Sequence, residues 1–547
     1  MAYKHTLIVS WLFALCIRLV VISWTTAPTV LSDEVDYFLA ARGPDGHPGI
    51  STLKYPPLYP LVITPAARIG DREMGFFMSR IMNAVLSSAV VPATWFLWGG
   101  AGLLGGCIVG ALSPGVITTP LILSENLFVL CTALWLLTGW RWIQSGTNRW
   151  KIFHGLAAAS CALTRAAGGS MVLTTMIFAL FTMRKSGKRS GIFAILAAFA
   201  PVIVYLLIRS GISFTPFNDP LASDHPTQIS RWYTGTLSDL TAGTPLETLA
   251  RIMPVPLMYA GLWFIYWAFQ YCLYLLMGTF FLPAVVLAGR THLEMDRKRL
   301  LQLLILVSVI LVMISANHTL AGVQADQFVR GRYVEPVMPL WVAFGLGIFQ
   351  RFRRISLVAL IPILFTDIRA LTASQNRSAD CMYPLRSLVR MNDQIPHWIP
   401  LLLGSLILLV LAVVWMRLLV SKRALPVLLI VVLTGLVIST LRYHKQHRIA
   451  CNDAAVARWL MKQDPHAEVA LDAATEDTDR AKESGIAWVA QQIRFFSTNP
   501  LTRMNNPRDP AYVLSDRMHG VPILCGEPAS GRLPDPPCLY RWYNREK

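Results

Sequence analysis

Residues 7–37 read LIVSWLFALCIRLVVISWTTAPTVLSDEVDY, and this stretch decides the class of protein. Residues 7–27 form an apolar run that, as one helix, can cross about 30 Å of hydrocarbon. The acidic pair Asp33–Glu34 follows where such a helix would meet water, with Asp36 close behind. Carboxylates near lipid usually face a cavity, a metal or a partner charge. The sequence therefore predicts a membrane protein with an acidic site at the membrane surface.

Apolar runs of similar length recur along the chain. Of its 547 residues, 54% are hydrophobic and only 15% are charged, against about 25% charged residues in soluble domains. This predicts an all-α polytopic membrane protein with about 13 transmembrane helices, because a β-barrel would show short alternating segments instead. The predicted spans are 7–27, 76–98, 101–119, 121–140, 152–166, 169–183, 191–210, 257–288, 300–317, 334–350, 355–371, 398–420 and 424–442.

The net charge of +18 comes largely from basic clusters in short loops between the apolar runs. This positive-inside pattern marks cytoplasmic loops and argues against nucleic-acid binding. The clusters lie at 141–151, 184–189, 290–299, 351–354 and 422–423. With the N-terminus inside, the opposite, extracytoplasmic face of the cytoplasmic (inner) membrane receives the longer segments. These are 28–75, 211–256, 318–333, 372–397 and the tail from 443.

Two domains are predicted. Residues 1–442 form a transmembrane domain, whose first extracytoplasmic loop, 28–75, carries the acidic motif. Residues 443–547 form an extracytoplasmic soluble domain of a size that suits a small α/β fold. Its short apolar segments are typical of one helix and three strands. They lie at 454–461, 468–472, 511–515 and 539–543. Cys525 and Cys538 close a short loop and could pair in an oxidising compartment.

The acidic pair has two interpretations. One carboxylate, Asp33 or Glu34, could take a proton from an acceptor hydroxyl while the other holds a divalent cation or orients the acceptor. Alternatively, Ser32 or Asp33 caps the start of a helix, with the acidic residues at its positive end. Both interpretations can hold, because a cap would fix the carboxylates in space.

The segment KYPPLYP, residues 54–60, marks the re-entry into the membrane. Its Pro-Pro pair ends any preceding helix and holds Lys54 near the interface. The Lys54 ammonium could bind a phosphate or simply extend to the headgroup boundary, with Tyr55 beside it as acceptor or structural support. Arg80, near the outer end of the second span, is a further candidate for the phosphate or a structural counter-ion.

Other charged residues stand near the outer ends of later spans. Glu125 could bind acceptor hydroxyls or pair with Arg165, which sits where the short hairpin turns; for Arg165 a structural role is favoured. Arg332 lies on the face where basic residues are scarce, and a bound anion would explain it, since arginine donates two hydrogen bonds to a phosphate at once. An interface anchor assisted by Tyr333 is the alternative.

The order of these motifs resembles that of the GT-C glycosyltransferases. The acidic motif and the Lys-x-Pro-Pro-Leu-like segment are followed by four further matching stretches. These are SRIMNA at 79–84, SENLF at 124–128, ALTRA at 162–166 and GRYVEPVMP at 331–339. The similarity is greatest to the branch with protein O-mannosyltransferases and the lipid A aminoarabinose transferase. It covers residues 1–350, and the rest only in layout.

The resemblance implies an inverting transferase that moves a sugar from a polyprenyl-phosphate donor to an acceptor hydroxyl on the extracytoplasmic face. Asp33 resembles the family's base or metal-coordinating aspartate, and Glu34 its companion acid. Lys54 resembles the lysine that meets the donor phosphate, although Tyr55 is inserted before the prolines. Arg332 and Tyr333 resemble the pair near the lipid phosphate. The implied cofactor is a divalent cation, Mg²⁺ or Mn²⁺, and the acceptor is a lipid, glycan or protein.

The sequence leaves other classes of function as alternatives to a glycosyltransferase. The chain contains no Gly-rich nucleotide loop and no Gly-x-Ser-x-Gly elbow, which fits a lipid-carried donor. A transporter or flippase for a lipid-linked or anionic substrate would use Arg332 and Glu125 along its path. The interfacial position of Asp33 and the lack of visible inverted repeats speak against it. A scaffold whose working part is the tail is the third alternative.

Overall fold

The computed structural model describes the chain in separate stretches. The continuous ones are residues 2–24, 32–42, 56–98, 122–186, 191–211, 293–322 and 334–349. Beyond these it describes scattered positions between 264 and 287, a few residues from 459 to 463 and five short strands between 469 and 541. At several helix ends, including residues 32–36, and in most of the strands it describes the backbone alone.

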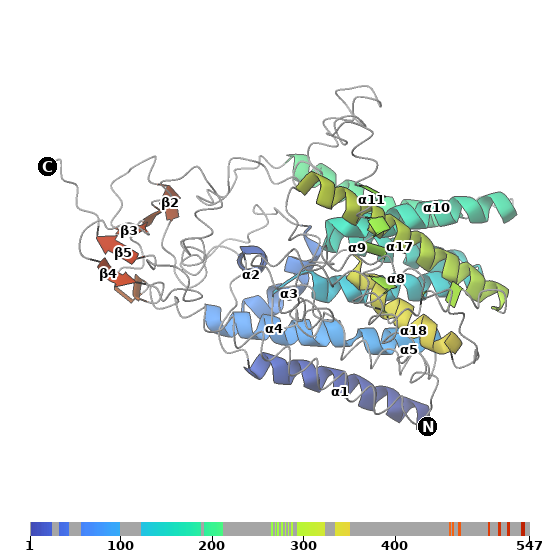
Figure 1. Cartoon of the computed structure of the whole chain (residues 1–547), viewed down its shortest axis with the longest axis horizontal. Coiled ribbons are helices and arrows are strands. Elements are labelled where there is room, and N and C mark those ends of the chain that lie inside the picture. The colour runs from blue at the N-terminus through green and yellow to red at the C-terminus, as the bar shows by residue number, and fades with distance from the viewer. Residues whose placement is uncertain are drawn as a thin grey trace, which may run out of the picture.

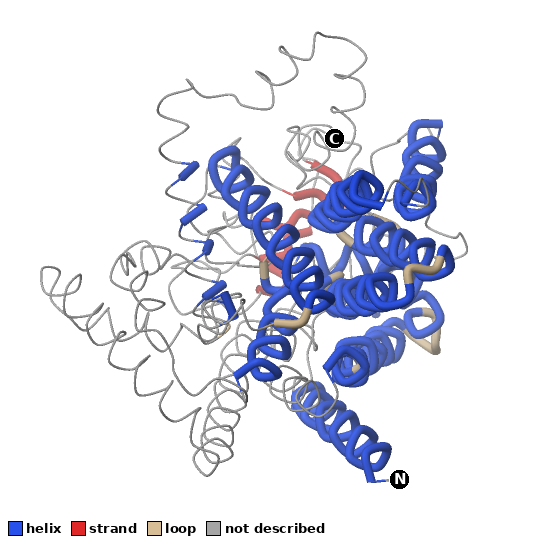
Figure 2. Tube along the Cα trace, turned by 90° about the vertical axis from the view of Figure 1, so that its right-hand side faces the viewer, coloured by secondary structure: helices blue, strands red, loops and turns tan. Residues whose placement is uncertain are grey.

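Helices make up the larger part of the described chain. They form a bundle in which α8 packs on α9, α9 on α10 and α11, and α17 on both α8 and α10 (Figures 1 and 2). The helices are α1 (Ala2–Trp24), α2 (Ser32–Arg42), α3 (Leu58–Ala67), α4 (Arg72–Ser88), α5 (Val90–Trp98), α8 (Glu125–Ser145), α9 (Asn148–Thr164), α10 (Gly169–Ser186), α11 (Ile192–Gly211), α17 (Met295–Gly322) and α18 (Met338–Phe349).

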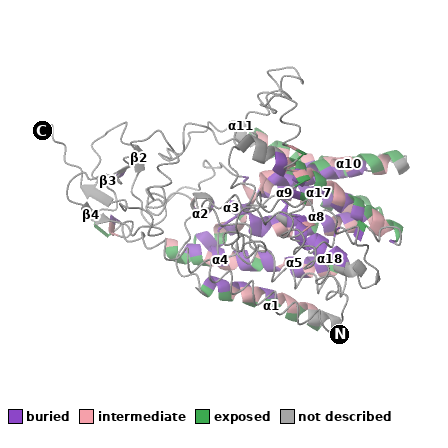
Figure 3. Cartoon of the chain, in the orientation of Figure 1, coloured by how far each residue is buried: buried purple, intermediate pink, exposed green. Residues whose placement is uncertain are grey.

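Length and composition confirm the prediction of a multi-pass membrane protein. Within the described stretches, four helical segments are long and apolar enough to cross a membrane: Arg72–Leu97, Glu125–Ser145, Ala166–Arg184 and Met295–Ala316. Buried residues gather where helices face one another, while the outer faces expose large apolar side chains (Figure 3). Val9, Phe181 and Leu207 are each more than 60% exposed, as expected for side chains that face lipid. The predicted spans 101–119, 355–371, 398–420 and 424–442 lie outside the described residues.

Local chemistry explains where several helices start and stop. Pro57 stands at the N-cap of α3, so the helix begins directly after the Pro-Pro pair. The Asp71 carboxylate accepts from the backbone N–H of Met74 and caps α4. The second predicted span, 76–98, is made of two helices, α4 and α5, that meet at Ala89. Helix α17 begins at Met295, so part of the basic cluster 290–299 is helical rather than loop.

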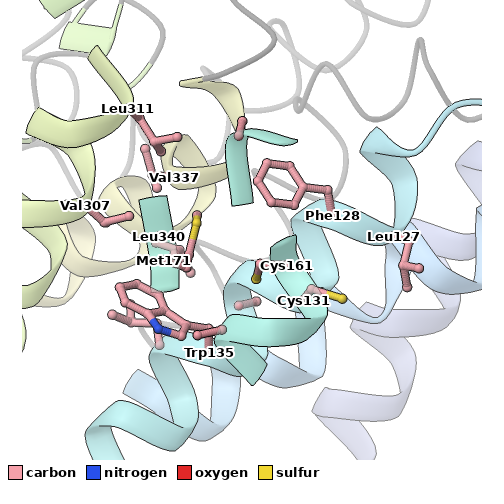
Figure 4. Packing of buried hydrophobic residues seen from close by; sticks show 14 of the residues in the cluster. Leu127, Phe128, Cys131, Trp135, Cys161, Met171, Val307, Leu311, Val337 and Leu340 are labelled. Atoms are coloured by element: carbon pink, nitrogen blue, oxygen red, sulfur yellow. The ribbon is translucent and has the colours of Figure 1, made fainter. Parts of the chain in front are cut away.

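The short hairpin predicted from its flanking basic loops is present. Helix α9 ends at Thr164, a 3-10 turn η2 covers Ala166–Gly168, and α10 runs back from Gly169. The core beneath the hairpin contains both a hydrogen bond and a ring stack. The Trp135 indole donates to the Thr175 hydroxyl at 3.0 Å and stacks on His154 with ring centroids 5.2 Å apart. These contacts join α8, α9 and α10. Figure 4 shows Trp135 and Met171 within the apolar cluster that continues to α17.

Five strands in the C-terminal part form one mixed sheet in the order β2-β1-β3-β5-β4. Strand β1 is parallel to β2 and β3, whereas β5 is antiparallel to β3 and β4. The strands are β1 (Val469–Leu471), β2 (Leu501–Arg503), β3 (Tyr512–Ser515), β4 (Pro522–Cys525) and β5 (Cys538–Arg541). Strands β1, β3 and β5 lie where the sequence predicts strands. Whether residues 443–547 fold as one α/β domain stays a prediction.

Candidate functional site

The acidic motif lies on a short helix, α2, which begins at Ser32 and places Asp33 and Glu34 in its first turn. A helix thus begins at the acidic motif, whereas a capping contact by Ser32 or Asp33 stays a prediction. Two aromatic side chains hold α2 against its neighbours. The Tyr37 ring meets the edge of the Tyr59 ring at a centroid distance of 5.1 Å, and the fully buried Phe38 meets the ring of Phe76 at 5.7 Å.

The C-terminal end of α2 is fastened to the turn between α3 and α4. The Arg42 guanidinium donates to the carbonyl oxygens of Ala67 at 3.0 Å and of Gly70 and Asp71 at 3.1 Å each. Ala67 is the last residue of α3, and a cation is favoured at the C-terminal end of a helix. Gly75 is required here, because a Cβ at this position would lie 2.3 Å from the Ala67 oxygen and 3.0 Å from the guanidinium.

A chain of polar contacts links α2 to the start of α8. The Tyr37 hydroxyl donates to the Ser124 hydroxyl at 3.1 Å, and Ser124 donates in turn to a carboxylate oxygen of Glu125 at 3.5 Å. The other carboxylate oxygen of Glu125 is in close contact with the Arg165 guanidinium. The Glu125 side chain is only 7% exposed and that of Arg165 13%. The two residues form a buried ion pair, as the sequence allowed.

Arg165 owes its position to the turn that follows α9. Its backbone is extended, its N–H donates to Cys161, and its carbonyl accepts from Gly168 at 2.9 Å. The η2 turn thereby folds back under the end of α9. A Cβ on Gly168 would lie 2.1 Å from the carbonyl carbon and oxygen of Cys161. The close approach that aims Arg165 at Glu125 therefore depends on glycine.

We expect Gly168→Ala to lower the free energy of unfolding by about 2 kcal/mol or more, because the Cys161 backbone cannot yield as a flexible side chain would. Gly169→Ala is the matched control: a Cβ on Gly169 meets nothing within 4 Å, and alanine favours the helix that begins there. The measurement is chemical unfolding of both purified variants in detergent. Equal stability of the two variants would contradict the role given to Gly168.

Arg80 is buried, and the Phe76 ring that it contacts also packs on Phe38 of α2. Its guanidinium donates to the Ile22 carbonyl at 3.5 Å and stands over the Phe76 ring at 5.6 Å. These contacts join the end of α1 to α4 and fit the structural interpretation that the sequence left open. One turn along α4, Asn83 accepts from the Tyr59 hydroxyl at 3.0 Å. A contact of Arg80 with a donor phosphate stays a prediction.

Four predicted site residues lie outside the described stretches: Lys54, Tyr55, Arg332 and Tyr333. The description resumes directly after the last two. Val334 is buried, and the 3-10 turn η7 (Glu335–Val337) contacts α8, the helix that begins with Glu125. Figure 4 shows Val337 and Leu340 near Met171 in the same core. The segment that follows the Arg-Tyr motif thus packs on the helix that carries the ion pair.

The two ends of the α8–α9 pair differ in charge. Glu125 and Arg165 lie at one end with α2, whereas the connection between the helices lies at the other. That far end carries Arg141, Arg149 and Lys151. Because α8 has 21 residues, the two ends are about 30 Å apart, close to the thickness of the hydrocarbon core. The acidic motif and this basic cluster therefore occupy opposite ends of the bundle.

Three residues that make hydrogen bonds around α2 and α3 were not singled out from the sequence. They are Tyr37, Ser124 and Asn83. Each stands inside a stretch that was recognised, but nothing in the sequence indicates that Tyr37 and Ser124 share a hydrogen bond. The contact spans 87 positions and arises only from the packing of α2 against α8. The sequence offered one indication of such contacts, namely that the predicted acidic site has a phenol and a hydroxyl group nearby.

The fold resembles those of solved structures. No protein-family model and no curated protein matches the sequence. The crystal structure of ArnT from Cupriavidus metallidurans bound to undecaprenyl phosphate does match, with a TM-score of 0.50 and 14% identity over 90% of this chain and 85% of that chain. The chain has the fold of ArnT, a GT-C protein. The resemblance drawn from the motifs is confirmed at the level of the fold.

Two further structures match with TM-scores below 0.50. One is ArnT from Cupriavidus metallidurans in the apo state, at a TM-score of 0.49 and 14% identity over 92% of this chain and 86% of that chain. The other is the archaeal oligosaccharyltransferase AglB from Archaeoglobus fulgidus in complex with an inhibitory peptide and a dolichol-phosphate. It has a TM-score of 0.46 and 9% identity over 91% of this chain and 64% of that chain.

Proposed function

We propose that this GT-C-fold protein is an inverting glycosyltransferase that moves a sugar from a polyprenyl-phosphate donor to an acceptor hydroxyl on the extracytoplasmic face of the cytoplasmic membrane. One observation carries the proposal. The acidic helix α2 is fastened through Tyr37 and Ser124 to the buried Glu125–Arg165 pair, in a fold shared with an ArnT structure that contains undecaprenyl phosphate. This anchoring gives the backbone of α2 a fixed place at one end of the bundle, which supports the proposed role of its acidic residues.

The proposed reaction is a single displacement at the anomeric carbon. Asp33 takes the proton of the acceptor hydroxyl as its oxygen forms the new glycosidic bond, since that hydroxyl ionises far above neutral pH. The bond to the lipid phosphate breaks with its electron pair, and polyprenyl phosphate leaves as an anion. We propose Lys54, Arg332 and Tyr333 as the groups that stabilise the leaving phosphate, with Arg80 nearby. Glu34 orients the acceptor.

The alternative role of Asp33 in this proposal is that of ligand to a divalent cation, Mg²⁺ or Mn²⁺. Helical periodicity puts positions 33 and 36 on one face of α2, and carboxylate oxygens are ligands that these ions prefer. When bound, the ion would neutralise charge on the donor phosphate. Among the side chains that the structure describes, no cluster of metal-binding residues is found; those of residues 32–36 are not in that set.

The topology belongs to the same proposal. About 13 crossings with the basic loops inside put α2, the Arg-Tyr motif and residues 443–547 on the outer face. The opposite ends occupied by α2 and by the basic α8–α9 connection support this orientation. A lipid, glycan or protein would then supply the acceptor hydroxyl, and the C-terminal part is the candidate for selecting it.

The deciding experiment compares transfer with transport in the same proteoliposomes. The probes are undecaprenyl-phosphate sugars with a radiolabelled hexose or pentose, given with a membrane extract as acceptor. We expect label to move into the extract and undecaprenyl phosphate to accumulate, in proportion to the protein. The transporter alternative predicts counterflow of label across the bilayer with the sugar–phosphate bond intact. Counterflow without release of undecaprenyl phosphate would overturn the proposal.

A further inference from the structure

The C-terminal sheet brings two cysteines together across neighbouring strands. In the antiparallel pair β4–β5, Cys525 is the Cα partner of Cys538. The neighbouring pairs, Leu524 with Leu539 and, past a bulge, Pro522 with Tyr540, continue the same ladder. Residues directly opposite in an antiparallel pair have Cα atoms about 4.5 or 5.5 Å apart and lie on the same face of the sheet. Both separations fall within the range that a disulfide spans, roughly 4.4–6.8 Å.

The position of this cysteine pair in the sheet indicates what a disulfide would stabilise. Among the strands that the structure describes, β4 stands at the edge of the sheet and pairs with β5 alone. Cys525 is its last residue and Cys538 the first of β5. The connection between them, GEPASGRLPDPP, is longer than a tight hairpin turn and does not by itself set the strand register. A covalent link at this point would hold the edge strand in place.

We propose that Cys525 and Cys538 form a disulfide that fixes strand β4 to the sheet. The inference rests on the extracytoplasmic placement of the C-terminal part, because disulfides persist in oxidising compartments. Each thiol loses its proton, and the two sulfurs lose two electrons as the S–S bond forms. An oxidised dithiol–disulfide carrier accepts both electrons by thiol–disulfide exchange, so that its own disulfide becomes two thiols.

The other cysteines provide controls. Cys131 and Cys161 are buried free thiols in the helical bundle. Cys381 and Cys451 lie outside the described residues but on the same predicted face, so they are the competing partners. We expect the doubly substituted Cys381→Ser/Cys451→Ser protein to keep the link, and Cys525→Ser to release Cys538 as a free thiol.

The experiment uses the full chain in membranes whose free thiols are blocked before solubilisation. Mass spectrometry of a non-reduced digest is expected to find the peptide of Cys525 joined to that of Cys538, and reduction is expected to release both for labelling. Free Cys525 and Cys538 in the unreduced wild type, or a link of either to Cys451 or Cys381, would overturn the inference. This readout on the wild type stands even if Cys525→Ser fails to fold.

A second measurement separates this inference from the proposed topology. Intact cells are reduced and treated with a membrane-impermeant maleimide, and the labelled peptides are identified. Labelling of Cys525 and Cys538 from outside would confirm that the C-terminal part is extracytoplasmic. If the two thiols were then found unlinked in the unreduced protein, the disulfide alone would be disproved. Labelling only after the cells are broken would overturn the topology and the disulfide together.

Discussion

Asp33→Asn is expected to reduce sugar transfer by about a hundredfold to ten-thousandfold, the usual contribution of a positioned general base. Asparagine keeps the size of the side chain and its ability to cap a helix, so α2 should still form and the protein should remain folded. The loss should appear in the rate of undecaprenyl-phosphate release in proteoliposomes, with donor binding largely kept. Turnover at the wild-type rate in a correctly folded Asp33→Asn protein would rule out the proposed chemistry.

The chain offers a matched control in the same region. Asp71 caps the N-terminus of α4 by accepting from the Met74 N–H at 2.8 Å, and Arg42 ties the adjacent turn to α2. Asp71→Asn removes a carboxylate beside the anchor of α2 while preserving the cap. We expect its transfer rate to stay near that of the wild type, which would show that a general change of charge in this region is not the cause.

The same assay separates the two roles open to Asp33. If its carboxylate holds a divalent cation, chelation should inactivate the wild type, added Mg²⁺ or Mn²⁺ should restore it, and Asp33→Asn should need more metal for its residual activity. A base that holds no metal predicts no effect of chelation. Either result keeps Asp33 in the reaction and decides how it acts.

The sequence predicts most of the described helical bundle because the length of an apolar run shows which segments can cross a membrane. Even the short hairpin of α9 and α10 was found, since two basic loops on one face require two crossings between them. The break of the second span at Ala89 was not predicted, although Pro92, which has no N–H to donate to the Ser88 carbonyl, stands three residues after it. Periodicity also said little about residues 56–70, where the short helix α3 stands.

The sequence predicted the charged residues of the candidate site but not the hydrogen bonds that join its helices. Glu125 and Arg165 each carry a charge that must be matched when it is buried, so the sequence could name the pair. The hydrogen bond from Tyr37 to Ser124 and the hold of Arg42 on the α3–α4 turn depend on how α2 docks. Docking is decided by the shapes of side chains from distant segments, and no local pattern of apolar residues reports it.

The Glu125–Arg165 pair is the second place where a large effect is expected. Glu125→Gln leaves the Arg165 guanidinium buried without its carboxylate, and we expect a loss of about 3–5 kcal/mol of stability, as for other buried pairs with one partner removed. The exposed pair Glu294–Arg297, with Glu294 70% exposed, is the matched control: Glu294→Gln should change stability by less than about 1 kcal/mol. Unfolding of the purified variants in detergent measures both.

The double variant Glu125→Gln/Arg165→Gln decides what the pair is for. If the two charges serve mainly to hold α8 and the α9 turn together, neutralising both should restore most of the stability lost in either single variant, the coupling that a double-mutant cycle isolates. Transfer should recover with it, because Ser124 would still receive the Tyr37 hydroxyl and hold α2. A double variant that is as stable as the wild type yet inactive would instead place Glu125 in contact with the acceptor.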